Sequence, residues 1–183
     1  MQNIKEQIIK IAEKLNIDCI GFTSINAFEE TKVVLEERMQ KGYLSGFEEK
    51  DIEKRINPLN VWEEAKSIIS IAISYHFDTP PLPNGELYGK IAKSAWGTDY
   101  HKVLQEKMEA FMQIVQEKVI PVQYRCFVDT GPLVDRAVAQ RAGLGFYGKN
   151  GFIIHPTLGT WFFIGNILVD IELEEGQSIQ ETN

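Results

Sequence analysis

Apolar residues recur at helical spacing in two parts of the chain. Ile4, Ile8, Ile11 and Leu15 stand three or four positions apart, which predicts an amphipathic helix near the N-terminus. The same spacing returns in a longer segment, marked by Tyr100, Leu104, Met108, Phe111 and Val115. Each of these segments is expected to bury one face and to leave the other in water.

Runs of β-branched and aromatic residues predict strands elsewhere. Ser67–Tyr75 (SIISIAISY) is almost continuously apolar, as expected of a central strand that is buried on both faces. Shorter runs predict strands at Cys19–Thr23, Val122–Val128, Phe152–Ile154 and Trp161–Val169. The last two are expected to be joined by a turn, in a hairpin-like arrangement.

Capping residues predict two further helices. Asn26 followed by Glu29 has the spacing of a capping box and is expected to open a helix that runs to about Gln40. The segment Pro132–Ala142 is expected to form a short helix with its proline at the first position and Gly143 just past its end.

The remaining segments are expected to be connections. Residues 42–58 suggest short helical turns, and Asp78–Gly85 (DTPPLPNG), with three prolines, suggests a loop. Helices and strands thus interleave irregularly along the chain. The predicted fold is of the α/β or α+β class, with a mixed β-sheet flanked by helices.

Composition is that of one soluble domain. The chain has 183 residues, of which 44% are hydrophobic and 25% charged, typical of a globular protein with a single core. Its apolar runs are too short to cross a bilayer, and its N-terminus lacks the apolar core of a signal peptide. Two cysteines, Cys19 and Cys126, make neither a disulfide framework nor a metal cluster. We therefore expect a cytoplasmic protein with no membrane partner.

Charge argues against a dedicated nucleic-acid-binding module, because the net charge is −7. The acidic excess lies in the first half and in the tail after Val169, whereas residues 86–150 carry a slight basic excess. The middle of the chain can therefore meet an anionic partner.

Two nucleotide-binding patterns fail on their context. Gly143–Gly148 fits GxGxxG and, extended to Lys149, also fits GxxxxGK. Such glycines must follow a strand and open a helix, whereas these follow a helix and lead into a strand. Asp99-Tyr-His101 begins like the cobalt-ligating DxHxxG signature, but Leu104 stands where its glycine should be. A surface or capping histidine is the more ordinary interpretation, and no metal site is assigned.

Asp129 is the strongest candidate for chemistry. It lies in VDTGP (128–132), where a strand is expected to end and a helix to begin, a position at which α/β folds hold ligands. The commoner explanation, an acid stabilised by the helix dipole, stays open, although Asp135 in the first helical turn is the more ordinary partner of that dipole. Gly148–Gly151 (GKNG) is similarly open: it fits a tight turn, or a backbone that lies against a flat ligand.

Taken together, these residues resemble the epoxyqueuosine reductase family. The similarity rests on Cys126–Leu168, on Gly97–Leu104 (GTDYHKVL), and on Arg55, Asn57-Pro58 and Ala65–Ile69, in order along nearly the whole chain. Members of that family are cobalamin-dependent iron–sulfur reductases that complete queuosine in tRNA. The resemblance implies a nitroreductase-like corrinoid domain over residues 1–169, and an acidic linker over 170–183 that leads towards a [4Fe–4S] ferredoxin-like domain.

The resemblance also implies a site and its partners. Asp129 matches the family's proton donor, which must be protonated near neutral pH, a state favoured by burial beneath the corrin. The implied cofactor contacts are Arg55, Asp129, Asn150, Gly151, Ile153, Trp161 and Ile164. Cobalamin would bind base-off, with two [4Fe–4S] clusters only in the full-length protein. The substrate would be the anticodon loop of a tRNA, and the protein a monomer.

Departures from the family pattern keep other functions open. Asn166 stands where a glutamate is frequent, and Phe146-Tyr147 where Trp-Ile is common. A corrinoid-dependent paralogue with another substrate is one alternative. A non-catalytic cobalamin-binding module and a flavin-binding reductase are the others, and the colour of the purified protein separates cobalamin from flavin.

Overall fold

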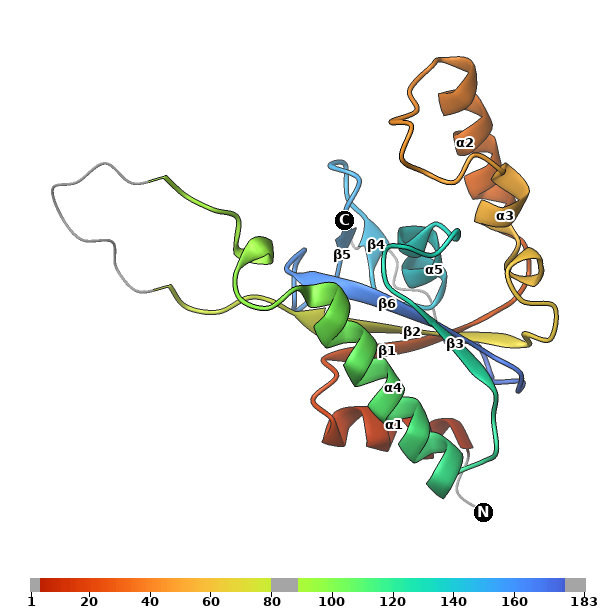
Figure 1. Ribbon diagram of the computed structural model, residues 1–183, viewed down its shortest axis with the longest axis vertical. Coiled ribbons are helices and arrows are strands. Elements are labelled where there is room, and N and C mark those ends of the chain that lie inside the picture. Colours follow the sequence, from red (N-terminus) through yellow and green to blue (C-terminus); the bar gives the residue numbers. More distant parts are fainter. Residues whose placement is uncertain (1–3, 80–88, 177–183) are drawn as a thin grey trace, which may run out of the picture.

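The structure is a computed structural model that describes residues 4–79 and 89–176. In chain order its elements are α1 (Ile4–Lys14), β1 (Cys19–Ser24), α2 (Glu29–Gln40), α3 (Ile52–Ile56), the 3-10 turn η1 (Pro58–Asn60), β2 (Ser67–Ser74), the 3-10 turn η2 (Lys93–Ala95), α4 (Tyr100–Lys118), β3 (Tyr124–Phe127), α5 (Asp135–Arg141), β4 (Phe146–Tyr147), β5 (Ile153–Ile154) and β6 (Phe162–Val169). Figure 1 shows a central sheet between two layers of helices.

The main sheet has the strand order β1-β2-β6-β3, and β4 pairs with β5 in a separate two-stranded hairpin. All three pairings of the main sheet are antiparallel. The expectation of a mixed sheet is corrected in this respect, while helices flanking a sheet are confirmed. The physical reason is that β6, the last strand, lies between β2 and β3. The helical crossover through α4 therefore joins two strands of the same direction that never pair.

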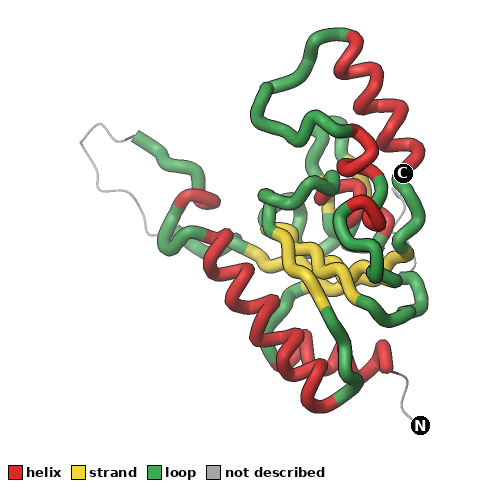
Figure 2. The backbone as a smooth tube through the Cα atoms, turned by 45° about the vertical axis from the view of Figure 1, so that its right-hand side comes forward, coloured by secondary structure: helices red, strands yellow, loops and turns green. Residues whose placement is uncertain are grey.

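The two faces of the sheet carry separate hydrophobic clusters. Ile69 and Ile71 of β2 belong to the cluster that contains Met108 of α4 and Ile8 of α1. Ile68, which precedes Ile69, faces the other layer, where the cluster includes residues of α3 and α5. Figure 2 shows the strands in yellow with α1 and α4 together on one side and α5 on the other. β2 is thus buried on both faces, as its sequence predicts.

Two glycines allow helices to pack directly on the sheet. A Cβ at Gly165 of β6 would lie 2.7 Å from the sulfur of Met108 in α4. A Cβ at Gly21 of β1 would lie 2.1 Å from the carbonyl oxygen of Ala142, at the end of α5. At Gly21 the atom belongs to the backbone, so a larger residue would push the end of α5 away from the sheet, whereas at Gly165 the side chain of Met108 would have to shift.

Two predicted helix starts are wrong in detail. The N-cap of α2 is Phe28, which makes no side-chain capping bond, so Asn26 and Glu29 form no capping box. Helix α5 begins at Asp135 rather than Pro132, because Leu133 is buried in the second cluster and Val134 is still extended. Gly143 follows the helix with a φ of +83°, as predicted.

Two expected connections fall partly outside the described residues. The predicted loop at Asp78–Gly85 lies outside them from residue 80, and the expected acidic tail lies outside them from residue 177. The described part of that tail lies along the domain, because the amide of Leu173 donates to Ser67 Oγ and the amide of Gly176 to the carbonyl of Phe22.

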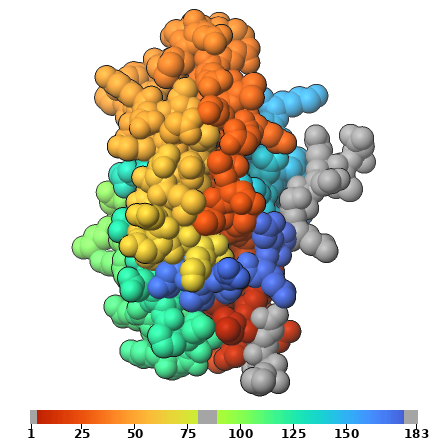
Figure 3. Space-filling view, turned by 90° about the vertical axis from the view of Figure 1, so that its right-hand side faces the viewer, coloured from red at the N-terminus to blue at the C-terminus, as the bar shows by residue number. Residues whose placement is uncertain are grey.

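Helices α2 and α3 form one end of the molecule. In Figure 3 this segment, in orange, lies at the opposite end from the red N-terminal helix. Phe47, in the connection between α2 and α3, is 97% exposed. Within residues 4–79 and 89–176, no helix combines the length and apolar character needed to cross a bilayer.

Candidate active site

A cavity of about 1720 Å³ lies at the end of the sheet where β2 and β3 end and β6 begins. Its walls come mainly from residues 47–55 of the α2–α3 region, residues 94–101 before and in α4, the β3–α5 loop at 129–136, and residues 152–164 around β5 and β6, and residues 60, 61 and 75 complete them. A cavity of this size exceeds the ~300–1,000 Å³ of ordinary small-ligand pockets. It therefore suits a large ligand or two ligands together.

Asp129 lies on a strained turn in the wall of this cavity. Its φ is +51°, in the left-handed backbone region that residues other than glycine, asparagine and aspartate seldom adopt. The amide of Thr130 donates to the carbonyl of Val128, which closes a three-residue turn around Asp129. Such a conformation costs on the order of 1–3 kcal/mol and persists at functional sites where the surroundings enforce it.

Tyr100 holds the Asp129 carboxylate. Its hydroxyl donates a hydrogen bond to Asp129 Oδ2. The Tyr100 ring is fixed in turn by stacking on Phe163 of β6, with ring centroids 4.0 Å apart and an interplanar angle of 5°. Burial, with the adjacent Asp129 carboxylate, raises the pKa of Tyr100, so the hydroxyl remains a donor throughout the physiological range.

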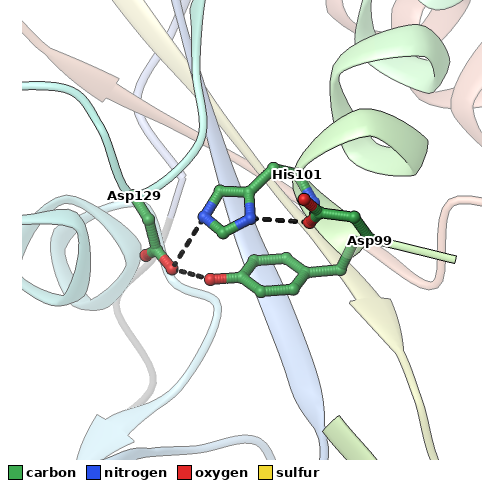
Figure 4. A network of polar contacts seen from close by, with 4 residues as sticks. Asp99, His101 and Asp129 are labelled. Carbon is green, nitrogen blue, oxygen red and sulfur yellow. Dashed lines mark hydrogen bonds and ion pairs between the residues drawn. The ribbon is translucent and has the colours of Figure 1, made fainter. Parts of the chain in front are cut away.

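His101 lies between two carboxylates. Its Nδ1 is 2.8 Å from Asp99 Oδ1, and its Nε2 is 3.9 Å from Asp129 Oδ2. Asp99 also caps α4, because Oδ1 accepts from the amide of His101 at 2.9 Å. The hydrogen bond with His101 lowers the pKa of Asp99. Figure 4 shows the imidazole reaching from Asp99 towards Asp129. This geometry lets His101 exchange protons with the Asp129 side of the cavity.

The cavity brings together four of the predicted site residues. Arg55, Asp129, Ile153 and Ile164 all line it, although they come from α3, the β3–α5 loop, β5 and β6. Ile153 is 3% exposed, so it contributes a fixed apolar surface. These residues are up to 109 positions apart, yet the fold places them around one space.

The other three predicted residues are not among the lining residues of this cavity. Asn150 Oδ1 accepts from the amide of Phe152, and the carbonyl of Gly151, whose φ is +76°, accepts from Arg136. Both belong to the turn between β4 and β5. Trp161 is 42% exposed and packs edge-on against Tyr75. Their predicted contacts with a cofactor therefore stay predictions.

Tyr100 and His101 are site residues that the sequence did not identify. His101 was expected to be a surface or capping residue, and Tyr100 to belong to the buried face of a helix. The available signal was their place at the start of a long helix directly after Asp99. Only the fold shows that this helix begins beside the turn that carries Asp129.

The cavity walls combine apolar groups with charged groups of both signs. Phe152, Ile153, Phe162 and Ile164 supply the apolar side, while Lys54, Arg55 and Arg136 also reach the cavity. Such a wall fits a large, partly apolar ring system with polar substituents or a phosphate at its edge. A corrinoid has this chemistry, and the residues present fit it.

Comparison with known proteins gives consistent similarities. The family model "Epoxyqueuosine reductase QueG, DUF1730" matches residues 55–130. An epoxyqueuosine reductase of Staphylococcus aureus is 43% identical over 94% of this chain and 46% of its own length. The structure of the epoxyqueuosine reductase from Streptococcus thermophilus is 40% identical, with a TM-score of 0.92, over 98% of this chain and 49% of that one. The chain thus spans about half the length of these relatives.

Two further solved structures bear on what such proteins bind. One epoxyqueuosine reductase, 38% identical with a TM-score of 0.89 over 98% of this chain and 49% of its own, was solved with an epoxyqueuosine-modified tRNA-Tyr stem loop. The Bacillus subtilis protein, 36% identical with a TM-score of 0.88 over the same shares, has an aspartate-bearing catalytic loop swung out of its active site.

More distant structures share the fold alone. A reductive dehalogenase whose structure suggests a mechanism for B12-dependent dehalogenation is 13% identical, with a TM-score of 0.60, over all of this chain and 22% of its own. The similarity to the reductases is much stronger, since it combines about 40% identity with nearly complete coverage of the chain. By sequence and by structure, the chain matches about half the length of the proteins of the epoxyqueuosine reductase family.

Proposed function

We propose that this chain is the corrinoid-binding catalytic portion of a reductase that converts epoxyqueuosine in tRNA into queuosine. The observation that carries the proposal is Asp129, held on a strained turn in the cavity wall and bonded by Tyr100. The relative solved with a modified tRNA stem loop supports the substrate. The size and mixed lining of the cavity support a corrinoid as the cofactor, and we propose that cobalamin binds base-off.

The overall reaction balances with two electrons and two protons. The epoxide loses its oxygen as water, and its two carbons become joined by a double bond. Cobalamin, when bound, would supply the two reducing electrons, and in the proposed full-length protein it would be recharged by two [4Fe–4S] clusters of a ferredoxin-like domain. The domain boundary is proposed near residue 169, with residues 170–183 leading towards that domain.

The residues of this chain manage the protons. Asp129 in its acid form donates a proton to the epoxide oxygen as the carbon–oxygen bond breaks. The Tyr100 hydroxyl fixes Oδ2, so that the proton is carried by Oδ1 of Asp129. General acid help of this kind contributes about 10²–10⁴-fold in rate. His101, between Asp99 and Asp129, connects the site to protons from solvent.

The remaining walls orient the ligands. Arg55 offers a cation to a corrin amide or to the cofactor's nucleotide phosphate, and Ile153 and Ile164 exclude water from one face of the ring. The anticodon loop would enter from the open side of the cavity. Excluding water strengthens the polar interactions that remain at the reacting atoms.

The first test is binding. The chain is titrated with cob(II)alamin, passed through gel filtration, and examined by absorbance and EPR spectroscopy. Co-elution of a base-off species supports the proposal, whereas a yellow protein with absorbance near ~450 nm indicates a flavin enzyme instead. The titration is repeated on the protein that includes the cluster domain, and no binding by either form refutes the corrinoid assignment.

The second test is turnover by the cluster-containing protein on a modified stem loop. Asp129→Asn should lower the rate at least 100-fold while cobalamin affinity changes less than about twofold, because the amide is isosteric but cannot donate the acid proton. Binding without turnover even in the unsubstituted protein would favour a non-catalytic module. Near-normal turnover by the variant would remove Asp129 from the mechanism.

A further inference from the structure

A second acid, Asp135, lines the same cavity as Asp129 and has no role in the function proposed above. It is the first residue of α5 and one of the residues that line the cavity. The Nδ2 group of Asn166 donates to Asp135 Oδ1 at 2.6 Å. The hydroxyl of Ser70 donates to Asn166 Oδ1 at 2.7 Å. Two consecutive hydrogen bonds therefore connect β2 through β6 to α5.

The first two residues of this series, Ser70 and Asn166, lie in the core of the domain. Ser70 and Asn166 are 0% and 1% exposed, and they pair directly across β2 and β6. Buried polar side chains are costly unless every one finds a partner. The side-chain amide of Asn166 is bonded at both ends, because its oxygen accepts from Ser70 and its nitrogen donates to Asp135 on the side of the cavity. The arrangement fixes the position of one carboxyl oxygen and leaves the other free to carry a proton.

The surroundings of Asp135 favour its protonated form. Burial, the largest cause, raises the pKa of Asp135 to about 7. The negative charge of Asp129 raises it as well, while the hydrogen bond from Asn166 and the charge of Arg136 lower it. Near neutral pH, therefore, Asp135 still holds a proton in a substantial fraction of molecules.

Few other titratable groups face Asp135 from the neighbouring elements. Tyr100 of α4 feels its charge, and Arg55 of α3 lines the same cavity. Strands β2, β5 and β6, which pack on α5 or pair with its neighbours, carry no titratable side chain, and β1 carries only Cys19. Glu48, Glu49, Asp99 and His101 also line the cavity, and Asp129 is the acid among these residues whose charge raises the pKa of Asp135.

We propose that Asp135, positioned by Asn166, forms an acid pair with Asp129 in the cavity and supplies the proton that Asp129 donates. This inference rests on the proposed role of Asp129. The protonated Asp135 passes its proton through cavity water to the Asp129 carboxylate, and Asp129 gives that proton to the leaving oxygen. Asp135 then regains a proton from solvent. Asp135 acts through Asp129 and is a positioning residue, not a group that touches substrate.

The first measurement needs neither cofactor nor substrate. Carboxyl carbons of the 183-residue chain are labelled with ¹³C, and their NMR shifts are followed from pH 3 to pH 9. In a coupled pair, each carbon reports the titration of both groups, so the Asp129 carbon should show a second step near pH 7. In Asp135→Asn, which can still accept from Asn166, that step should vanish. A single-step Asp129 curve in the unsubstituted chain overturns the proposal.

The second measurement is the pH profile of turnover by the cluster-containing protein. Asp135→Asn should move the alkaline limb of kcat down by about one pH unit, a tenfold loss of rate above the limb, because no second acid restores Asp129. Asp135→Glu should recover most of the loss. Glu106→Gln, which removes an equal charge from the exposed face of α4, should leave the profile in place.

The two arms separate the two proposals. If the cluster-containing protein is inactive, or if Asp129→Asn remains active, the proposed function fails while the NMR titration still decides whether the acids are coupled. If Asp129→Asn is inactive but Asp135→Asn has an unshifted profile, the function stands and the role of Asp135 is refuted. If Asp135→Asn does not fold, the titration of the unsubstituted chain and Asp135→Glu remain decisive.

Discussion

Arg141 is expected to be the most stabilising cation of the described domain. It lies at the end of α5, where its guanidinium donates to Thr23 Oγ1 at 2.9 Å and to the carbonyls of Ser24 and Asn26 at 2.8 and 2.7 Å. It also covers the ring of Phe28, 3.5 Å from the centroid. One side chain thus fixes the whole connection between β1 and α2.

The magnitude follows from these contacts and from their cost. Burial lowers the pKa of Arg141 to about 10, so the group is charged at neutral pH but loses part of its hydration energy. A hydrogen bond to a charged group contributes about 1.5–3 kcal/mol, and removing the donor leaves the carbonyls of Ser24 and Asn26 without their partner. After the desolvation cost is subtracted, we expect Arg141→Met to lower the free energy of unfolding by about 3 kcal/mol.

Arg136 provides a matched control on the same helix. It is exposed, donates to the carbonyl of Gly151 at 2.9 Å, and lies 5.0 Å from the ring centroid of Phe152. Arg136→Met should therefore cost no more than about 1 kcal/mol. With an m-value of about 2 kcal/mol/M, urea unfolding should show a midpoint about 1.5 M lower for Arg141→Met. Midpoints within 0.3 M of each other, in the two variants, would refute this account of Arg141.

Two further predictions concern stability. Folding raises the pKa of Asp135 from 3.8 to about 7. The stability that the protonated carboxyl contributes is therefore fully present below its pKa in the unfolded chain, and it is lost as the pH rises through 7. Asp135→Asn should therefore gain stability relative to the unsubstituted chain between pH 4 and pH 8. The gain is bounded at about 4 kcal/mol, from three units at about 1.4 kcal/mol each, and solvent in the cavity reduces it. If the thermal midpoint of Asp135→Asn differs from that of the unsubstituted chain by the same amount at pH 4 and at pH 8, this account of Asp135 is wrong. Gly21→Ala should cost at least about 2 kcal/mol, since its Cβ would meet the carbonyl of Ala142, whereas Gly89→Ala, with no atom within 4 Å, should be neutral in the same urea assay.

The local sequence pattern predicts an element correctly where that element's own burial determines its apolar positions. The helical spacing from Ile4 to Leu15 predicts α1, and the apolar run at Ser67–Tyr75 predicts β2 as a central strand. Both signals come from burial along a single segment, which the sequence shows directly. The sheet direction was not accessible in this way, since it depends on β6 inserting between β2 and β3.

Helix starts and the site depend on contacts that local pattern does not contain. Pro132 has the local signature of a helix start, but burial of Leu133 keeps the chain extended for two more residues. Asp129 was found from its position at a strand end, whereas Tyr100 was assigned to the core because its spacing is that of a buried helical face. The bond between them joins residues 29 positions apart and exists only once α4 has packed beside β3.

The strained turn at Asp129 decides which substitution can test its chemistry. With φ at +51°, asparagine is tolerated almost as well as aspartate, while alanine adds a backbone cost of about 1 kcal/mol. Asp129→Asn should thus unfold at the same urea concentration as the unsubstituted chain, and Asp129→Ala at a lower one. A loss of turnover in Asp129→Asn then reports the missing proton, whereas the same loss in Asp129→Ala mixes chemistry with a displaced turn. Equal stability of the two variants would show that the turn is relaxed, and that the left-handed backbone at Asp129 gives no support to its catalytic role.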